Sequence, residues 1–210
     1  MKELIIFDFD GTIANTEEAS YQVYEQMTTI YGVPQMTREE LKAFKKKPLK
    51  QRIKETGIPY YLLPKIMSES QSKLTKFMDD AYPFDGIPHL LKTLSKKYKL
   101  VVVSSNNKKI IKQFLKTHQL DMFEKIYGGA ALFGKAPTIK KAIKKMKSKV
   151  KKSLYIGDET RDYHACHELK LDMIAVSWGY EDKEVLMNEK IPFIAHNPKE
   201  LMTLIEDHNV

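Results

Sequence analysis

The chain has 210 residues, of which 42% are hydrophobic, and it carries a formal net charge of +8 at pH 7. This length and this composition suit a core domain with a smaller insert, and they exclude a globally disordered chain. No apolar run approaches the ~20 residues that a membrane helix needs, and the single cysteine, Cys166, excludes an intrachain disulfide, so we expect a cytoplasmic protein.

Four short apolar segments, each followed by polar residues, predict buried strands of a parallel sheet. They cover residues 4–7, 100–103, 153–156 and 173–176. Helical patterns precede each of the last three segments, and further ones follow. The predicted helices cover roughly residues 86–97, 107–117, 136–147, 160–169 and 198–207. This alternation predicts an α/β fold, a Rossmann-like parallel sheet flanked by helices.

The segment between the first two predicted strands has a different pattern. It contains helical patterns and no convincing strand, and these patterns lie near residues 16–31, 37–44, 48–56 and 60–79. We therefore expect a small all-helical cap inserted after the first strand, with Pro83 and Gly86 marking the return of the chain. The predicted domains are a core of residues 1–14 and 83–210 and a cap of residues 15–82.

The first strand ends in the sequence Asp8-Phe9-Asp10-Gly11-Thr12. Two carboxylates at positions i and i+2 of a tight loop can point the same way, so one can attack phosphorus while the other transfers protons to and from the leaving group. Gly11 allows the backbone to turn sharply at this point. The alternative is an acidic turn that only closes the strand.

The third predicted strand ends in Gly157 and Asp158, and Asp162 follows four residues later. This spacing places both carboxylates on one side of the first turn of the next helix. Because ligands bind beyond the carboxyl ends of the strands in an open parallel sheet, these carboxylates should lie near Asp8. Hard carboxylate oxygens are ligands for Mg²⁺. Alternatively, Asp158 only caps the helix.

Two further segments complete the candidate site. Ser104, Ser105 and Asn106 follow the second predicted strand and offer a hydroxyl and backbone amides at a helix N-terminus, where a phosphoryl group can bind. An ordinary helix cap is the alternative, and either serine could fill the phosphoryl-binding position; we prefer Ser104 because it directly follows the strand. Lys135 stands just before a predicted helix and could offset the charge of the clustered carboxylates.

These four motifs, in this order, resemble those of the haloacid dehalogenase superfamily of phosphotransferases, and the resemblance covers essentially the whole chain. The helical insert resembles the cap of the phosphoglycolate-phosphatase-like branch. By this resemblance Asp8 is the nucleophile and Asp10 the general acid and base, and Lys135 stabilises Asp8 and the phosphoryl group. The residues implied to bind the phosphoryl group are Ser104, with Ser105, Asn106, Gly11 and Thr12 beside it. Those implied to hold Mg²⁺ are Asp8, the main-chain carbonyl of Asp10, and Asp158, with Asp162 in support.

The implied function is a Mg²⁺-dependent phosphatase that hydrolyses a small phosphomonoester, phosphoglycolate-like or a sugar or nucleotide phosphate, through an aspartyl phosphate on Asp8. A phosphomutase of the same superfamily, similar to beta-phosphoglucomutase, would keep all four motifs, and a non-catalytic phosphate-binding protein is a further alternative. A membrane is not expected as a partner because no apolar run is long enough to span it. Nucleic acid is not expected either, because the basic stretches 45–52 and 140–152 carry no aromatic interleaving or nucleic-acid motif and fit solvated helix faces. Trp178 is interpreted as a packing residue, and the physiological substrate and oligomeric state stay open.

Overall fold

A computed structural model describes residues 2–45, 47, 49–129 and 134–207 of the chain. It divides into two compact units, Met1–Asn15 with Tyr82–Val210 and Thr16–Ala81, and we call the second unit the helical insert. In this described part of the chain, no helix is both long and apolar enough to cross a membrane.

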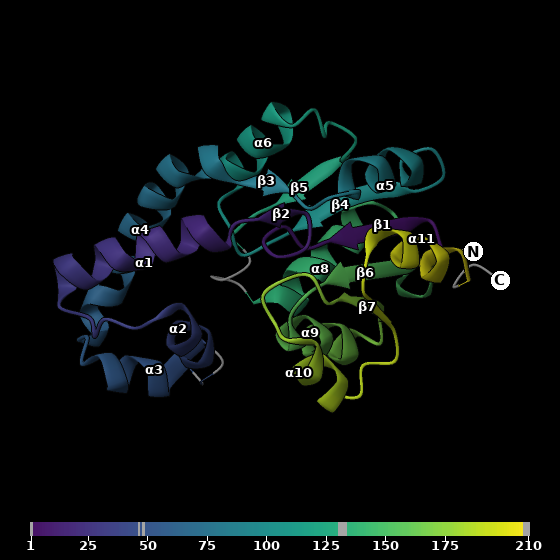
Figure 1. Cartoon of the computed structure of the whole chain (residues 1–210). Coiled ribbons are helices and arrows are strands. Elements are labelled where there is room, and N and C mark those ends of the chain that lie inside the picture. The colour runs from purple at the N-terminus through teal and green to yellow at the C-terminus, as the bar shows by residue number, and fades with distance from the viewer. Residues whose placement is uncertain (1, 46, 48, 130–133, 208–210) are drawn as a thin grey trace. The chain divides into compact units, whose positions relative to one another are not determined.

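A six-stranded parallel sheet forms the centre of the first unit (Figure 1). Its strands, in spatial order, are β5 (Lys125–Tyr127), β4 (Lys99–Val103), β1 (Leu4–Phe7), β6 (Ser153–Gly157), β7 (Asp172–Val176) and β8 (Ile194–Ala195). The four strands predicted from apolar runs are all present, which confirms the predicted α/β class. The sequence pattern missed β5 and β8, which are only three and two residues long.

Helices pack on both sides of this sheet (Figure 1). They are α5 (Ile87–Leu94), α6 (Lys108–Thr117), α8 (Lys135–Lys145), α9 (Thr160–Leu169), α10 (Lys183–Asn188) and α11 (Pro198–Asp207), with the short 3₁₀ turn η3 (Val150–Lys152) before β6. Leu4 and Ile6 of β1 point into a core formed with α8 and α9, where Ile139 and Cys166 are buried. Ile5 and Phe7 are also fully buried, so both faces of the central strand are covered, as expected for a parallel sheet.

Within the described residues of the helical insert there are six helical segments. They are α1 (Glu17–Tyr31), α2 (Arg38–Lys45), α3 (Leu49–Thr56), η1 (Tyr60–Leu62), α4 (Leu63–Phe77) and η2 (Met78–Asp80). Helices α1 and α4 pack along each other, and the Tyr31 hydroxyl donates a hydrogen bond of 2.8 Å to Glu69. The single helix predicted over 60–79 is divided by 3₁₀ turns at both ends. Pro48 of the predicted helix 48–56 and Lys46 of the basic stretch lie outside the described residues.

A two-stranded antiparallel ribbon lies where the chain leaves and re-enters the first unit. Strand β2 (Ala14–Asn15) pairs with β3 (Tyr82–Pro83), and Ala14 lies opposite Pro83. The Asn15 amide also donates a hydrogen bond of 3.2 Å to the Tyr82 hydroxyl. This ribbon joins the two ends of the insert, and its two-residue strands are too short to leave a readable sequence pattern.

Candidate active site

The register of the sheet brings three polar loops to one edge. Phe7, the last residue of β1, pairs with Val102 of β4 on one side and with Ile156 of β6 on the other. The loops after these parallel strands therefore leave the sheet side by side. The amide of Asp8 continues the ladder by donating to the Ile156 carbonyl at 2.8 Å, which aligns Asp8 with the end of β6.

Lys135 connects Asp8 with Asp162. As the first residue of α8, it places its Nζ 2.5 Å from Asp8 Oδ2, and it also forms an ion pair with Asp162 Oδ1. The second Asp8 oxygen, Oδ1, accepts a hydrogen bond of 2.7 Å from the Phe9 amide. Burial alone would lower the pKa of Lys135, but Asp162 and Asp8 outweigh this effect and raise it, so the ammonium stays charged. Asp8 is thus held on both oxygens, by the Lys135 ammonium and by the Phe9 amide.

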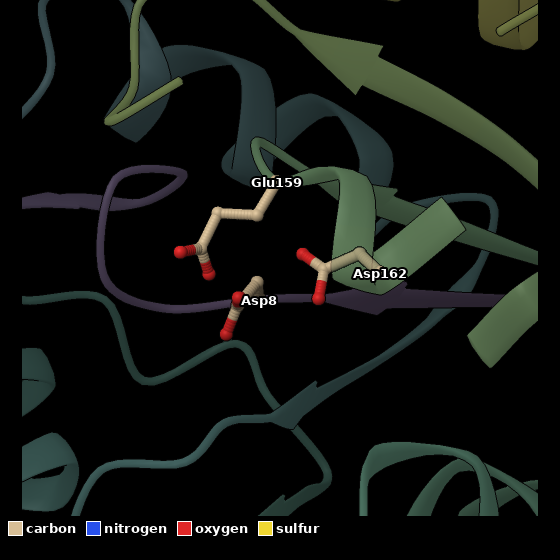
Figure 2. A group of neighbouring side chains, drawn as sticks. All are labelled: Asp8, Glu159 and Asp162. Atoms are coloured by element: carbon tan, nitrogen blue, oxygen red, sulfur yellow. The ribbon is translucent and has the colours of Figure 1, made fainter. Parts of the chain in front are cut away.

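Asp8, Glu159 and Asp162 form an acidic group that could hold a metal ion. One oxygen from each of the three residues lies within 4.8 Å of the others. Figure 2 shows their carboxylates turned toward a common space. Burial raises the pKa of Asp162 to about 7, with Lys135 opposing this shift and Asp8 adding to it. Asp162 Oδ2 is buried and has no hydrogen-bond partner among the described residues, so a buried oxygen remains available. Hard oxygen donors with one buried oxygen left unsatisfied fit Mg²⁺.

Asp158 lies beside this group and is itself fully buried. Its Oδ1 accepts a hydrogen bond of 2.9 Å from the Thr12 hydroxyl, and its Oδ2 accepts one of 2.8 Å from the Tyr180 amide. Gly11 has a φ of +73°, and a Cβ at this position would overlap the Asp158 carboxylate. Burial raises the pKa of Asp158 well above its ordinary value, and Glu159 and Asp8 add to the effect. Asp158 therefore ties the loop after β1 to the loop after β6.

Ser104 and Asn106 contact Asp10. The Asn106 side-chain amide donates a hydrogen bond of 3.0 Å to Asp10 Oδ1, and the Ser104 hydroxyl lies 3.4 Å from Asp10 Oδ2. The Asn106 backbone amide donates to the Ser104 hydroxyl at 3.0 Å. Ser105 lines a cavity of about 410 Å³ together with Lys135 and other residues. Three of the five residues expected to bind a phosphoryl group thus lie beside Asp10 or Lys135.

Three residues of the site went unrecognised in the sequence. Glu159 lies inside the motif that holds Asp158 and Asp162, so its position was a usable signal. Trp178 was interpreted as packing, and its ring does lie 6.5 Å from that of Phe84, but its Nε1 also donates to the Thr12 carbonyl at 3.2 Å. Glu181 accepts hydrogen bonds from Thr160 at the start of α9, a contact between separate loops that no local pattern indicates.

Comparison with known proteins gives consistent results. A family model described as haloacid dehalogenase-like hydrolase matches residues 5–176. Phosphoglycolate phosphatase from Synechococcus elongatus is 22% identical over 205 residues, covering 97% of this chain and 97% of the relative. Pyrophosphatase PpaX from Listeria innocua is 24% identical over 210 residues, covering 97% and 96%. The solved structure of a haloacid dehalogenase-like family hydrolase from Streptococcus pneumoniae superimposes with a TM-score of 0.84 at 23% identity, covering 97% and 98%, and shows the fold.

Proposed function

The chain belongs to the haloacid dehalogenase-like hydrolase family and, by homology to phosphoglycolate phosphatases, is a phosphatase; we propose that it hydrolyses a small phosphomonoester through an aspartyl phosphate on Asp8. The observation that carries this proposal is the ion pairing of Lys135 with both Asp8 and Asp162 at the carboxyl edge of the sheet. We place the reaction in the cytoplasm.

In the first step, a carboxylate oxygen of Asp8 forms a bond to phosphorus while the bond from phosphorus to the leaving oxygen breaks. Asp10, two residues away, donates a proton to that leaving oxygen. The hydrogen bond from Asn106 to Asp10 Oδ1 supports this role because it orients the Asp10 carboxyl group. Lys135 offsets negative charge on Asp8 and on the phosphoryl oxygens as the transfer proceeds.

In the second step, Asp10 takes a proton from a water molecule whose oxygen attacks phosphorus. The bond between phosphorus and Asp8 breaks, which restores the carboxylate and releases inorganic phosphate. Asp10 ends this step protonated, ready for another cycle. Ser104, Ser105, Asn106, Gly11 and Thr12 are the residues that we propose to contact the phosphoryl group.

Mg²⁺ is the cofactor that we propose for this site. Asp8, Glu159 and Asp162 would hold it, with Asp158 and the main-chain carbonyl of Asp10 as further proposed ligands. The unsatisfied, buried Asp162 Oδ2 supports this assignment. When bound, the ion would neutralise charge that builds up on the phosphoryl oxygens.

The substrate that we propose is a small molecule with a second anionic group. Two relatives support this choice, since one is named a phosphoglycolate phosphatase and the other a pyrophosphatase. We further propose that residues 15–82 form a cap domain that selects the leaving group. The motifs of the core, residues 1–14 and 83–210, account for binding and transfer of the phosphoryl group but not for recognition of the rest of the substrate.

The test is phosphate release from an aryl phosphate and a panel of small phosphorylated metabolites, with and without Mg²⁺, beside the Asp8→Asn variant. Metal-dependent release that the substitution abolishes is the expected result. No release by a folded, metal-bound protein would contradict the proposal. Transfer of the phosphoryl group to a second hydroxyl, in place of free phosphate, would assign the chain to the phosphomutases.

A further inference from the structure

The loop after β7, residues 177–181, contacts the loops that follow β1 and β6. Trp178 Nε1 donates to the Thr12 carbonyl at 3.2 Å, and the Tyr180 amide donates to Asp158 Oδ2 at 2.8 Å. A Cβ at Gly179 would overlap both Asp158 and the Gly11 carbonyl, so only glycine permits this close approach. The loop therefore helps to fix the position of Asp158 through direct contact.

The N-terminus of α9 is capped from this loop. Glu159 occupies the N-cap position with an extended backbone, φ −121° and ψ 147°, yet its side chain makes no capping hydrogen bond. Glu181 caps the helix instead. One of its carboxylate oxygens accepts from the Thr160 amide at 2.5 Å, and the other lies 3.3 Å from the Thr160 hydroxyl. The first amides of a helix need such acceptors, and a negative charge is favoured at this end.

We propose that Glu181 is a positioning residue for the metal site: because Glu181 caps α9, the Glu159 carboxylate, which pairs with Arg161 through Oε2, is not drawn to the end of the helix and faces Asp8 and Asp162. This inference rests on the proposed function, in that it takes the three-carboxylate group as the Mg²⁺ site. Two observations support it independently of each other. The capping bonds go to Glu181 and not to the N-cap residue itself, and the buried Asp162 Oδ2 lacks a hydrogen-bond partner among the described residues.

Removal of Glu181 has a defined consequence in this arrangement. The Thr160 amide loses its acceptor, and the Glu159 side chain, at the N-cap position itself, could turn toward the exposed end of the helix. Glu159 would then be drawn away from Asp8 and Asp162, while Asp162, in the first turn of α9, would lose part of its fixed orientation. Substitution of groups that orient metal ligands commonly costs about 10- to 100-fold in metal affinity.

The experiment is calorimetric titration of the full chain with Mg²⁺, comparing the wild-type protein with Glu181→Ala, Glu181→Gln and Glu159→Gln. The exposed Glu184, at the start of α10, gives a control of equal charge, Glu184→Ala. We expect Glu181→Ala and Glu159→Gln each to weaken Mg²⁺ binding by about tenfold or more. Glu181→Gln keeps an oxygen that can accept from the Thr160 amide, so its affinity should return to within about threefold of wild type. Glu184→Ala should bind as the wild type does.

A purely structural cap would behave differently. Glu181→Ala would then lower the melting temperature but leave the Mg²⁺ affinity of the folded protein unchanged, and this result would overturn the proposal. Loss of affinity in Glu181→Gln as large as in Glu181→Ala would also overturn it, because charge and not capping would be responsible. A wild-type protein that binds no Mg²⁺ would overturn both this inference and the metal-dependent function. Metal binding with the expected variant pattern, but without phosphate release, would contradict only the function.

Discussion

Replacing Asp162 by asparagine removes the fully buried carboxylate that pairs with Lys135. Its pKa is raised from 3.8 to about 7, mainly by burial, with Lys135 opposing and Asp8 adding to the shift. Between these two values the folded protein keeps a proton that the unfolded chain has released. The free energy of unfolding therefore falls as the pH rises through this window in the metal-free protein.

The size of this effect follows from the shift. Each pH unit inside the window changes the free energy of unfolding by up to about 1.4 kcal/mol. At pH 5 the Asp162 carboxyl group is already ionised in the unfolded chain, whereas in the folded protein it ionises near pH 7. The free energy of unfolding therefore falls by about 3 kcal/mol between pH 5 and pH 8. The raised pKa of Lys135 likewise makes the free energy of unfolding fall as the pH rises, but only above the ordinary lysine value, outside this range. The amide that Asp162→Asn introduces would not titrate, so the variant lacks this pH dependence.

The assay is urea unfolding of metal-free protein at pH 5, 6, 7 and 8, for the wild type and Asp162→Asn. The control is Glu168→Gln, an exposed residue on the same helix. We expect the wild type to lose about 3 kcal/mol more than Asp162→Asn over this range, and Glu168→Gln to follow the wild type. Saturating Mg²⁺ should restore the wild type at pH 8 and leave Asp162→Asn little changed. Parallel pH profiles for the wild type and Asp162→Asn would refute the reasoning.

Three further predictions concern neighbouring groups. Asp10→Ala should lower kcat by about 10²- to 10⁴-fold with an unchanged circular dichroism spectrum, since it removes the proposed acid and base; full turnover would contradict that role. Lys135→Ala should destabilise the fold by about 3–5 kcal/mol in urea unfolding because it leaves buried carboxylates unpaired, and a similar loss from exposed Lys140→Ala would argue against this cause. Gly179→Ala should cost about 1–3 kcal/mol in the same assay and reduce kcat, because its Cβ overlaps Asp158; a wild-type kcat would show that this loop does not position the site.

The central strands could be predicted from the sequence because they are continuous apolar runs. Residues 4–7 and 153–157 are buried on both faces, so no charged residue interrupts them. The edge strands left no such signal. Strand β5 begins with the exposed Lys125 and is only partly buried, and β8 has two residues. Their pairing depends on neighbouring strands and not on their own sequence.

The positions of the acidic residues could also be predicted, because each follows the end of a recognisable strand. The contacts that each acidic residue makes could not be predicted. The sequence offers no sign that Glu181 caps the helix that begins at Thr160, which leaves Glu159 facing Asp8. Nor does it indicate that Asp158 is engaged on both oxygens by Thr12 and Tyr180. These contacts join loops far apart in the chain, and they depend on the order of the strands in the sheet.

The charge balance of the site links its stability to its proposed chemistry. Asp8, Asp158, Glu159 and Asp162 are four carboxylates, and among the described residues the cations that form ion pairs with them are Lys135 and Arg161. With all of these groups ionised, two negative charges remain in excess. Burial makes this excess costly, which is why the pKa values of Asp158 and Asp162 are raised. A divalent cation would balance it, and by stabilising the carboxylate forms it would lower both pKa values. Protons and Mg²⁺ should therefore compete for this cluster, and the proposed activity should decline as the pH falls below about 7 at limiting Mg²⁺ but not at saturating Mg²⁺.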